Sequence, residues 1–90
     1  MLPISQGAIM VTMNDFREEL QAQIKRAIGQ GRPHVEINAG ELHRVVSPSE
    51  NRHPMACAAM REFQKPSDEV IHAPPAGDGP SFTLRYMLPR

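Results

Sequence analysis

Residues 38–65, NAGELHRVVSPSENRHPMACAAMREFQK, predict two short helices joined by a polar turn. Asn38 is a preferred N-cap residue, and Glu41 stands three positions later, as in a capping box. The apolar residues that follow have helical spacing: Leu42, Val45 and Val46. The run from Ser47 to Asn51 ends this helix, so the first half of the stretch is a helix followed by a turn.

A second helix follows the turn, because Pro54 is tolerated in a first helical turn and an apolar face comes after it. That face comprises Met55, Ala56, Ala59, Met60 and Phe63. The opposite face presents small, polar and basic residues: Cys57, Ala58, Arg61, Gln64 and Lys65. Together the two helices and their turn predict a helix-turn-helix.

Short strands are predicted on both sides of this pair of helices. The segment 34–37 alternates in polarity and contains two β-branched residues. The segments 69–72 and 81–87 also have strand composition, and the proline- and glycine-rich loop 73–80 between them predicts a β-hairpin with a protruding loop. The residues of its second strand that face the helices are Phe82, Leu84 and Tyr86.

Another helix is predicted before the first strand. A capping box of Asp15 and Glu18 starts this helix, and Gly29 or Gly31 ends it. Its apolar face comprises Phe16, Leu20, Ile24, Ala27 and Ile28. The charged residues of the other face are expected to be solvated.

The order helix, strand, helix, helix, strand, strand is that of a winged helix-turn-helix, an α+β fold in which the hairpin is the wing. A generic α+β sandwich of three helices on three strands has the same order and stays open as an alternative. We expect a loose tail at residues 1–13 and a single domain at residues 14–90, in which Val35 and Ile37 pair with the hairpin. The shared core is expected to contain Leu20, Ile24, Leu42, Val46, Phe63, Phe82 and Leu84.

Ninety residues with no net charge limit the functions open to this chain. One domain of this size has no room for a deep catalytic cavity and a cofactor domain, so we expect neither an enzyme nor a cofactor. Ten basic residues balance ten acidic ones, which counts against strong non-specific DNA binding. The chain has neither a signal-peptide pattern nor a membrane-spanning segment, so we expect a cytoplasmic protein.

Cysteine and histidine give little support for a metal site. Cys57 is the only cysteine, which excludes an internal disulfide and a multi-cysteine zinc site. His53 and Cys57 have the i, i+4 spacing of two ligands on one helix. A closed site needs two more ligands, which only His34, His43, His72 or scattered carboxylates would supply, so no metal is predicted.

Several motifs of this chain carry a family resemblance. They are the run Ile37 to Arg44, then Arg52 with Pro54 and Cys57, then Ala73-Pro74-Pro75, Leu84-Arg85-Tyr86 and Leu88-Pro89-Arg90. From Val35 to Arg90 the chain resembles a small, uncharacterised bacterial domain that is sometimes labelled with restriction or HNH-endonuclease proteins. The chain departs from that pattern at Ala56, Ala58 and Ala59, where the family has a second cysteine and β-branched residues. The resemblance implies no catalytic residue here, and no HNH metal finger is visible, so the nuclease label belongs to a partner domain or a neighbour.

The candidate contacts to duplex DNA lie on the second helix, just before it and on the hairpin. They are Asn51, Arg52, His53, Arg61, Gln64, Lys65 and Arg85. Arginine side chains bind guanine edges or phosphates, and an asparagine caps a helix or contacts adenine. In the alternative interpretation, Arg61 and Lys65 are surface charges paired with Glu62 or Asp68.

Three classes of function stay open on the sequence alone. A DNA-binding module comes first, a winged helix that binds another protein comes second, and a small enzyme is a distant third. The surface distinguishes the first two. A basic patch that joins Arg52, Arg61, Lys65 and Arg85 favours DNA, whereas an apolar patch of methionines favours a protein partner. The methionines in question are Met55, Met60 and Met87.

Overall fold

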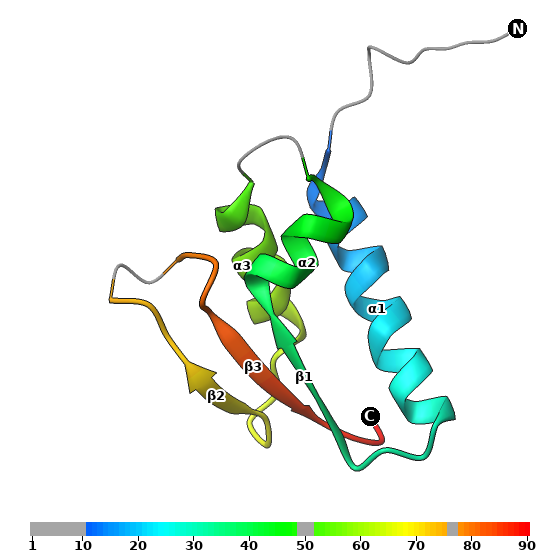
Figure 1. The fold of residues 1–90 in the computed structure, drawn as a ribbon. Coiled ribbons are helices and arrows are strands. Elements are labelled where there is room, and N and C mark those ends of the chain that lie inside the picture. Colours follow the sequence, from blue (N-terminus) through cyan, green and yellow to red (C-terminus); the bar gives the residue numbers. More distant parts are fainter. Residues whose placement is uncertain (1–10, 49–51, 76–77) are drawn as a thin grey trace, which may run out of the picture.

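Three helices cover one face of a three-stranded antiparallel sheet in the computed structural model, which describes residues 11–48, 52–75 and 78–90 (Figure 1). The elements are α1 (Met13–Gly29), β1 (His34–Asn38), α2 (Ala39–Val46), α3 (His53–Phe63), β2 (Glu69–His72) and β3 (Thr83–Met87). This order confirms the predicted α+β fold, whose arrangement is winged-helix-like.

The sheet has the order β1-β3-β2, so the last strand of the chain lies in the middle. Ile37 of β1 and Val70 of β2 both stand opposite Leu84 of β3. The alternation predicted for β3 is confirmed, because Leu84 and Tyr86 are fully buried under the helices. The alternating residues Thr83, Arg85 and Met87 are only half-buried. All four residues of β2 are exposed, since the helices do not extend over this edge of the sheet.

The helix α1 begins earlier than predicted. Thr12 is the N-cap, and its backbone N–H donates to the Asp15 carboxylate at 2.8 Å, so the capping box joins Thr12 and Asp15 rather than Asp15 and Glu18. The apolar face is confirmed at Phe16, Leu20, Ile24 and Ala27, which are buried, whereas Ile28 is 36% exposed. Gly29 is the last helical residue, and Gly31 reverses the chain with a φ of 73°.

The cap of α2 is confirmed, because the Asn38 Oδ1 accepts the Glu41 backbone N–H at 3.0 Å. Its apolar stripe is partly wrong, since Val45 is 60% exposed. His43 is buried in its place, one position along the stripe that starts at Ala39 and Leu42. The eight-residue helix therefore packs through positions 39, 42, 43 and 46, the i, i+3, i+4, i+7 pattern of one helix face.

The buried side of α3 is wider than its apolar pattern indicated. Cys57 was expected on the solvent face, but it is fully buried beside Ala56, Ala59 and Met60. The helix packs against α1 and α2 and also against the segment before β3, where the Cys57 thiol lies 3.5 Å from the Gly79 carbonyl. Burial raises the pKa of the thiol, so Cys57 is a core residue without thiolate character.

The hairpin loop does not protrude freely along the part that the structure describes. The Gly40 backbone N–H donates to the Pro80 carbonyl at 3.0 Å, and the Ala39 N–H donates to the Phe82 carbonyl at 2.8 Å. These bonds fasten the end of the loop to the first turn of α2. None of the helices in the described ranges is long and apolar enough to cross a bilayer.

Candidate nucleic-acid interface

Two of the predicted contact residues connect the start of α3 to α2. The Arg52 backbone N–H donates to Nε2 of the buried His43 at 2.7 Å. The His53 ring stacks on the His43 ring, with centroids 4.0 Å apart and planes 17° apart. Burial lowers the pKa of His53, and the neighbouring His43 lowers it further. Both residues therefore build the turn, while Asn51 lies outside the described residues.

Arg61 connects α3 to the hairpin loop. Its guanidinium pairs with the Asp78 carboxylate at 2.5 Å and lies 4.7 Å from the centre of the Phe82 ring. The partner that we expected on the sequence alone was Glu62 or Asp68. Glu62 instead pairs with Arg17 of α1 at 2.7 Å, and Asp68 pairs with Arg90 at 2.7 Å.

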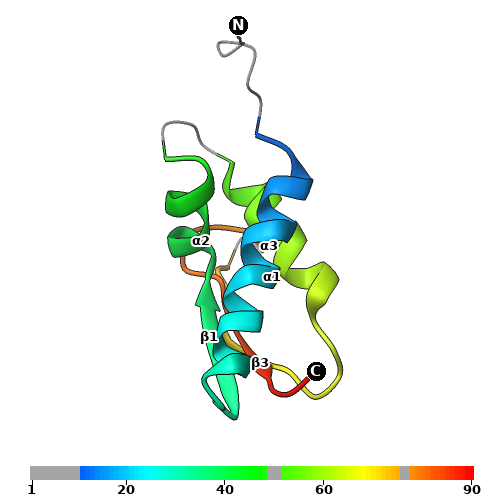
Figure 2. The same ribbon diagram turned by 90° about the vertical axis from the view of Figure 1, so that its right-hand side faces the viewer.

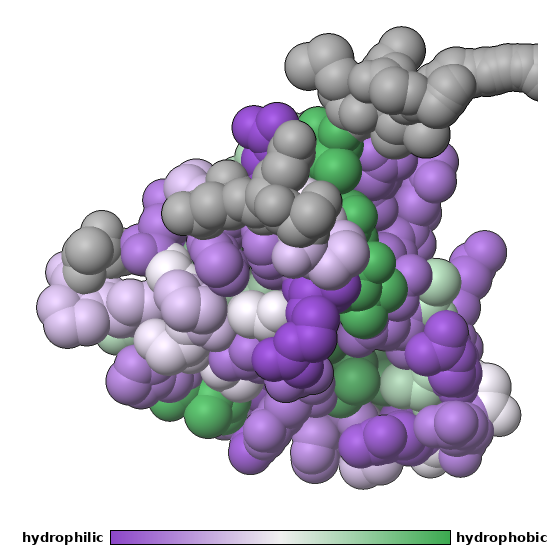
Figure 3. All heavy atoms as spheres, turned by 45° about the horizontal axis from the view of Figure 1, so that its top comes forward, coloured by the Kyte–Doolittle hydropathy of each residue, from purple (hydrophilic) through white to green (hydrophobic). Residues whose placement is uncertain are grey.

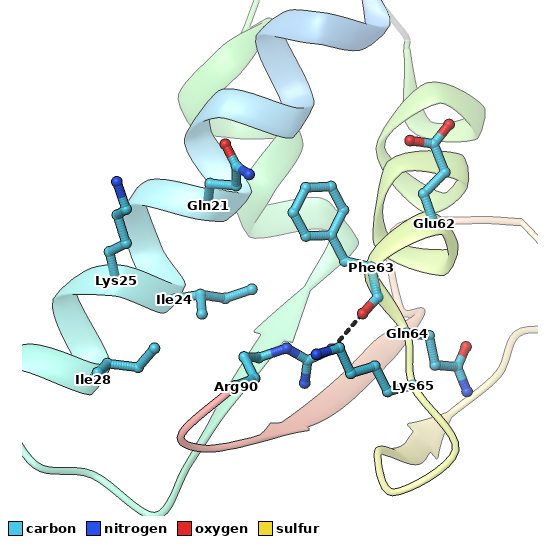
Figure 4. A pocket seen from close by; sticks show the side chains of 9 residues that line it. All are labelled: Gln21, Ile24, Lys25, Ile28, Glu62, Phe63, Gln64, Lys65 and Arg90. Atoms are coloured by element: carbon cyan, nitrogen blue, oxygen red, sulfur yellow. Dashed lines mark hydrogen bonds between the residues drawn. The ribbon is translucent and has the colours of Figure 1, made fainter.

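Gln64 and Lys65 lie just beyond the end of α3, where the chain turns toward β2. Both side chains are exposed and line a groove between α1 and α3 (Figure 4). The Lys65 backbone N–H donates to Asp68 at 2.7 Å, which fixes the turn. These two residues consequently flank α1 as well as α3.

Arg85 lies on the outer face of the sheet, on the side opposite the helices. Its guanidinium donates to Glu36 of β1 at 2.7 Å and to Glu69 of β2 at 2.9 Å. The hydrogen bond to Glu36 contributes most to raising the pKa of Arg85, and the one to Glu69 adds to it. Because Arg61 lies against Phe82 on the helical side, the structure does not bring Arg85 and Arg61 onto one surface.

The surface shows neither the basic patch expected of a DNA-binding module nor the methionine patch expected of a protein-binding one. Arg52 directly precedes α3, and Arg61 lies on α3 beside Asp78 of the hairpin loop. Lys65 lines the α1–α3 groove and Arg85 lies on the outer sheet face, so the four residues do not form one patch. Met60 is fully buried, and Met55 and Met87 are half-buried, so these three methionines do not form an exposed patch. Within the described residues, the exposed large apolar side chains are Ile28, Val45, Val70 and Ile71.

A polar cluster under the end of α3 was not predicted. The Tyr86 hydroxyl donates to the Met60 carbonyl at 2.7 Å, and the Arg90 guanidinium donates to the Phe63 carbonyl, so two terminal carbonyls of α3 are satisfied by the C-terminal segment. Asp68 holds this cluster by accepting from Arg90 and from the Met87 backbone N–H at 2.8 Å. The only local signal was an aspartate three residues after Lys65 in a proline-containing turn.

No group of three or more histidine, cysteine, aspartate or glutamate side chains is arranged to hold a metal ion within the described ranges. Comparison with known proteins does not identify the chain. No family model, no curated protein and no solved structure matches it, so the resemblance noted in the sequence stays a prediction.

Proposed function

We propose that this domain binds duplex DNA through the exposed strip of α3. The observation that carries the proposal is the winged-helix-like element order together with a strip of small and basic side chains that the packing leaves outside. Pro54, Ala58 and Arg61 follow each other at intervals of four and three residues and are exposed or half-buried. Small residues beside an arginine let a helix approach a groove closely.

The ion pair of Arg61 does not prevent a phosphate contact. Both side chains of the Arg61–Asp78 pair are more than 40% exposed, and such pairs contribute only about 0–1 kcal/mol. A phosphate therefore replaces Asp78 at low cost, and the release of counterions from DNA favours the exchange. Because the whole domain is neutral, we expect weak binding that falls steeply with salt.

Fluorescence anisotropy with a mixed-sequence duplex at low and physiological salt tests this function. Arg61→Ala should lose about 1–3 kcal/mol of binding free energy. Asp78→Asn should bind more tightly than the wild type, because it removes both a charged partner of Arg61 and a charge that repels phosphate. Arg85→Ala is the matched control, since it removes an ion-paired arginine from the outer sheet face and should leave affinity nearly unchanged.

Two results would contradict the proposal. One is a wild-type protein that fails to bind duplex at low salt. The other is an equal loss of affinity in Arg61→Ala and Arg85→Ala, which would assign the effect to total charge rather than to the surface of α3.

A protein-binding winged helix is the second candidate, and the edge strand β2 favours it. Val70 is 50% exposed and Ile71 is 43% exposed, and an exposed strand edge with apolar side chains is a common docking element. Affinity capture with the wild type and with Ile71→Lys tests this candidate. Partners recovered only with the wild type support it, and identical sets of captured proteins reject it.

A further inference from the structure

The unpaired charges of this neutral domain are separated in space. Six carboxylates in the described part of the chain form ion pairs: Glu36, Glu41, Glu62, Asp68, Glu69 and Asp78. The other three lie together on the first half of α1: Asp15, Glu18 and Glu19. Their hydrogen bonds go to neutral groups of Thr12, Asn14 and Gln23. Their negative charge is therefore not compensated by any described cation.

These carboxylates surround an apolar hollow, which we call the acidic end. It has a volume of about 400 Å³ between the start of α1 and the end of α2, and Val11, Val45 and Val46 line it. Val45 is 60% exposed and adds apolar surface to this hollow. In Figure 3, which brings the top of Figure 1 forward, a strip of hydrophobic surface crosses a mostly hydrophilic face.

The second groove has the opposite charge, and we call it the basic groove. It has a volume of about 440 Å³ between the end of α1 and the end of α3, and its apolar residues are Ile24, Ile28 and Phe63 (Figure 4). Lys25 comes from α1 and Lys65 from the segment after α3, and neither forms an ion pair with a described residue. The remaining charged residues of the lining are already paired, Glu62 with Arg17 and Arg90 with Asp68.

The two ends cannot meet within one molecule. The acidic end lies between α1 and α2, whereas the basic groove lies between α1 and α3, nearer the other end of α1. α1 packs on both α2 and α3, and in the view of Figure 2 these two helices lie to different sides of it, so the two sites are on different flanks of α1. A packed helix does not bend to join them. Only a second molecule can bring the unpaired charges together.

We propose that the domain associates head to tail, with the acidic end of one copy seated on the basic groove of the next. In this contact Val45 packs against Ile28 and Phe63, and the carboxylates of Glu18 and Glu19 pair with Lys25 and Lys65 of the neighbouring copy. Apolar surface supplies affinity, and the complementary charges fix orientation. Because the two surfaces differ, the contact is heterologous and extends beyond a dimer. Pro54, Ala58 and Arg61 line neither site, so the contact does not use the surface of the proposed DNA binding.

Sedimentation velocity of the full chain over a range of concentrations, at low and high salt, tests this association. The wild type should form concentration-dependent oligomers that weaken as salt screens the charges. A Lys25→Glu/Lys65→Glu variant and a Glu18→Lys/Glu19→Lys variant should each associate about tenfold more weakly or worse, because like charges then face each other. Glu18, Lys25 and Lys65 are exposed and Glu19 is half-buried, and circular dichroism verifies that both variants fold.

An equimolar mixture of the two variants gives the decisive result. The unchanged acidic end of one variant faces the unchanged basic groove of the other, and the two reversed sites also carry opposite charges. Association should therefore return to the wild-type level. Arg26→Glu/Arg32→Glu is the matched control, since it reverses two exposed charges at the same end of α1 that do not line the groove. It should change association by about twofold at most, because its charges face solvent.

Three outcomes would overturn the proposal. A wild type that stays monomeric at low salt excludes the contact. Association that neither charge reversal weakens belongs to another surface, such as the edge of β2. A mixture that stays monomeric although both variants fold shows that the two ends do not bind each other.

Discussion

Gly40 is the residue at which the backbone leaves least room. A Cβ there would lie 2.9 Å from the Pro80 carbonyl oxygen. The same oxygen accepts a hydrogen bond from the Gly40 backbone N–H. Gly40→Ala should therefore push the hairpin loop off α2 and cost about 1–3 kcal/mol of unfolding free energy in a urea titration. Gly29→Ala is the matched control, since nothing lies within 4 Å of its new Cβ, and alanine gains up to about 1 kcal/mol over glycine in a helix. Equal stability of the two variants would show that the loop is not held against α2.

His53 makes the stability of the turn depend on pH. Its pKa is lower in the folded protein than the ordinary 6.5, because burial and the neighbouring His43 disfavour its charged form. The unfolded chain then takes up the proton first, so this contribution to stability is complete above pH 6.5 and is lost as pH falls toward the folded pKa. We expect unfolding free energy to decrease between about pH 7 and pH 5.

The variant His53→Phe keeps a stacked ring and removes the titration. Its unfolding free energy should change less over the same pH interval than that of the wild type. A pH dependence identical in both proteins would assign the effect to another group.

For single residues, the sequence predicted the contacts that depend on residues a few positions away. The Asn38 cap was predicted because its partner, the Glu41 N–H, is three residues away. The burial of His43 was not, because it depends on the Arg52 N–H nine residues later and on a stack with His53. A histidine in an apolar stripe gives no local sign that a backbone donor will satisfy it.

Among the elements, α3 depends most on residues far along the chain. Asp68 is buried, and it accepts from Arg90 and from the backbone N–H groups of Lys65 and Met87. Burial alone would raise the pKa of this carboxyl, but these hydrogen bonds outweigh it and hold the pKa below the ordinary 3.8. Asp68 thereby links the end of α3, the following turn and the end of β3.

Replacing Asp68 by asparagine should cost about 3–5 kcal/mol at pH 7, because the Arg90 charge then lies buried without its partner. Glu41→Gln is the matched control in an exposed pair with Arg44 and should cost about 0–1 kcal/mol. The stabilisation by Asp68 is present above the unfolded pKa and is lost as pH falls below it, toward the lower folded pKa. Chemical unfolding at pH 7 and pH 3 should therefore show a smaller difference between wild type and variant at the lower pH, and a constant difference would contradict this account.

The order of the elements was predictable, because caps, apolar periodicity and turn residues act within a few positions. The buried faces of α2 and α3 were harder to predict. One residue of the α2 stripe was wrong, because Val45 is exposed and His43 is buried, and only the packing on α1 and α3 decides which of the two faces the core. The burial of Cys57 likewise depends on Gly79, which approaches α3 only after the hairpin has formed.

Across the whole molecule, the charges decide how the candidate site is distributed. Arg61 pairs with Asp78, and Arg85 pairs with Glu36, a residue 49 positions away. The sequence identified the arginines as possible contacts, but it did not show which carboxylates the fold would place beside them. The candidate contacts inferred from the second helix and the hairpin therefore do not share one surface, since Arg61 lies on the helical side and Arg85 on the outer sheet face.

Two residues of α2 that stand one turn apart, Leu42 and Val45, should contribute very differently to the stability of the single core. Leu42 is fully buried among α1, α3 and the sheet, whereas Val45 is 60% exposed although the sequence placed both in one stripe. Leu42→Ala should cost about 2–5 kcal/mol, because it removes buried methyl groups and leaves a cavity. A domain of this size has about 5–10 kcal/mol in all, so a large part of its stability would be lost.

The substitution Val45→Ala is the matched control and should stay within about 0.5 kcal/mol of the wild type in dilute protein. Helix content followed by circular dichroism and the environment of Tyr86 followed by fluorescence should report the same transition, because helices and sheet share one core. Comparable losses in both variants would restore the stripe expected from sequence. Separate transitions for the two probes would mean that the helices and the sheet do not unfold as one unit.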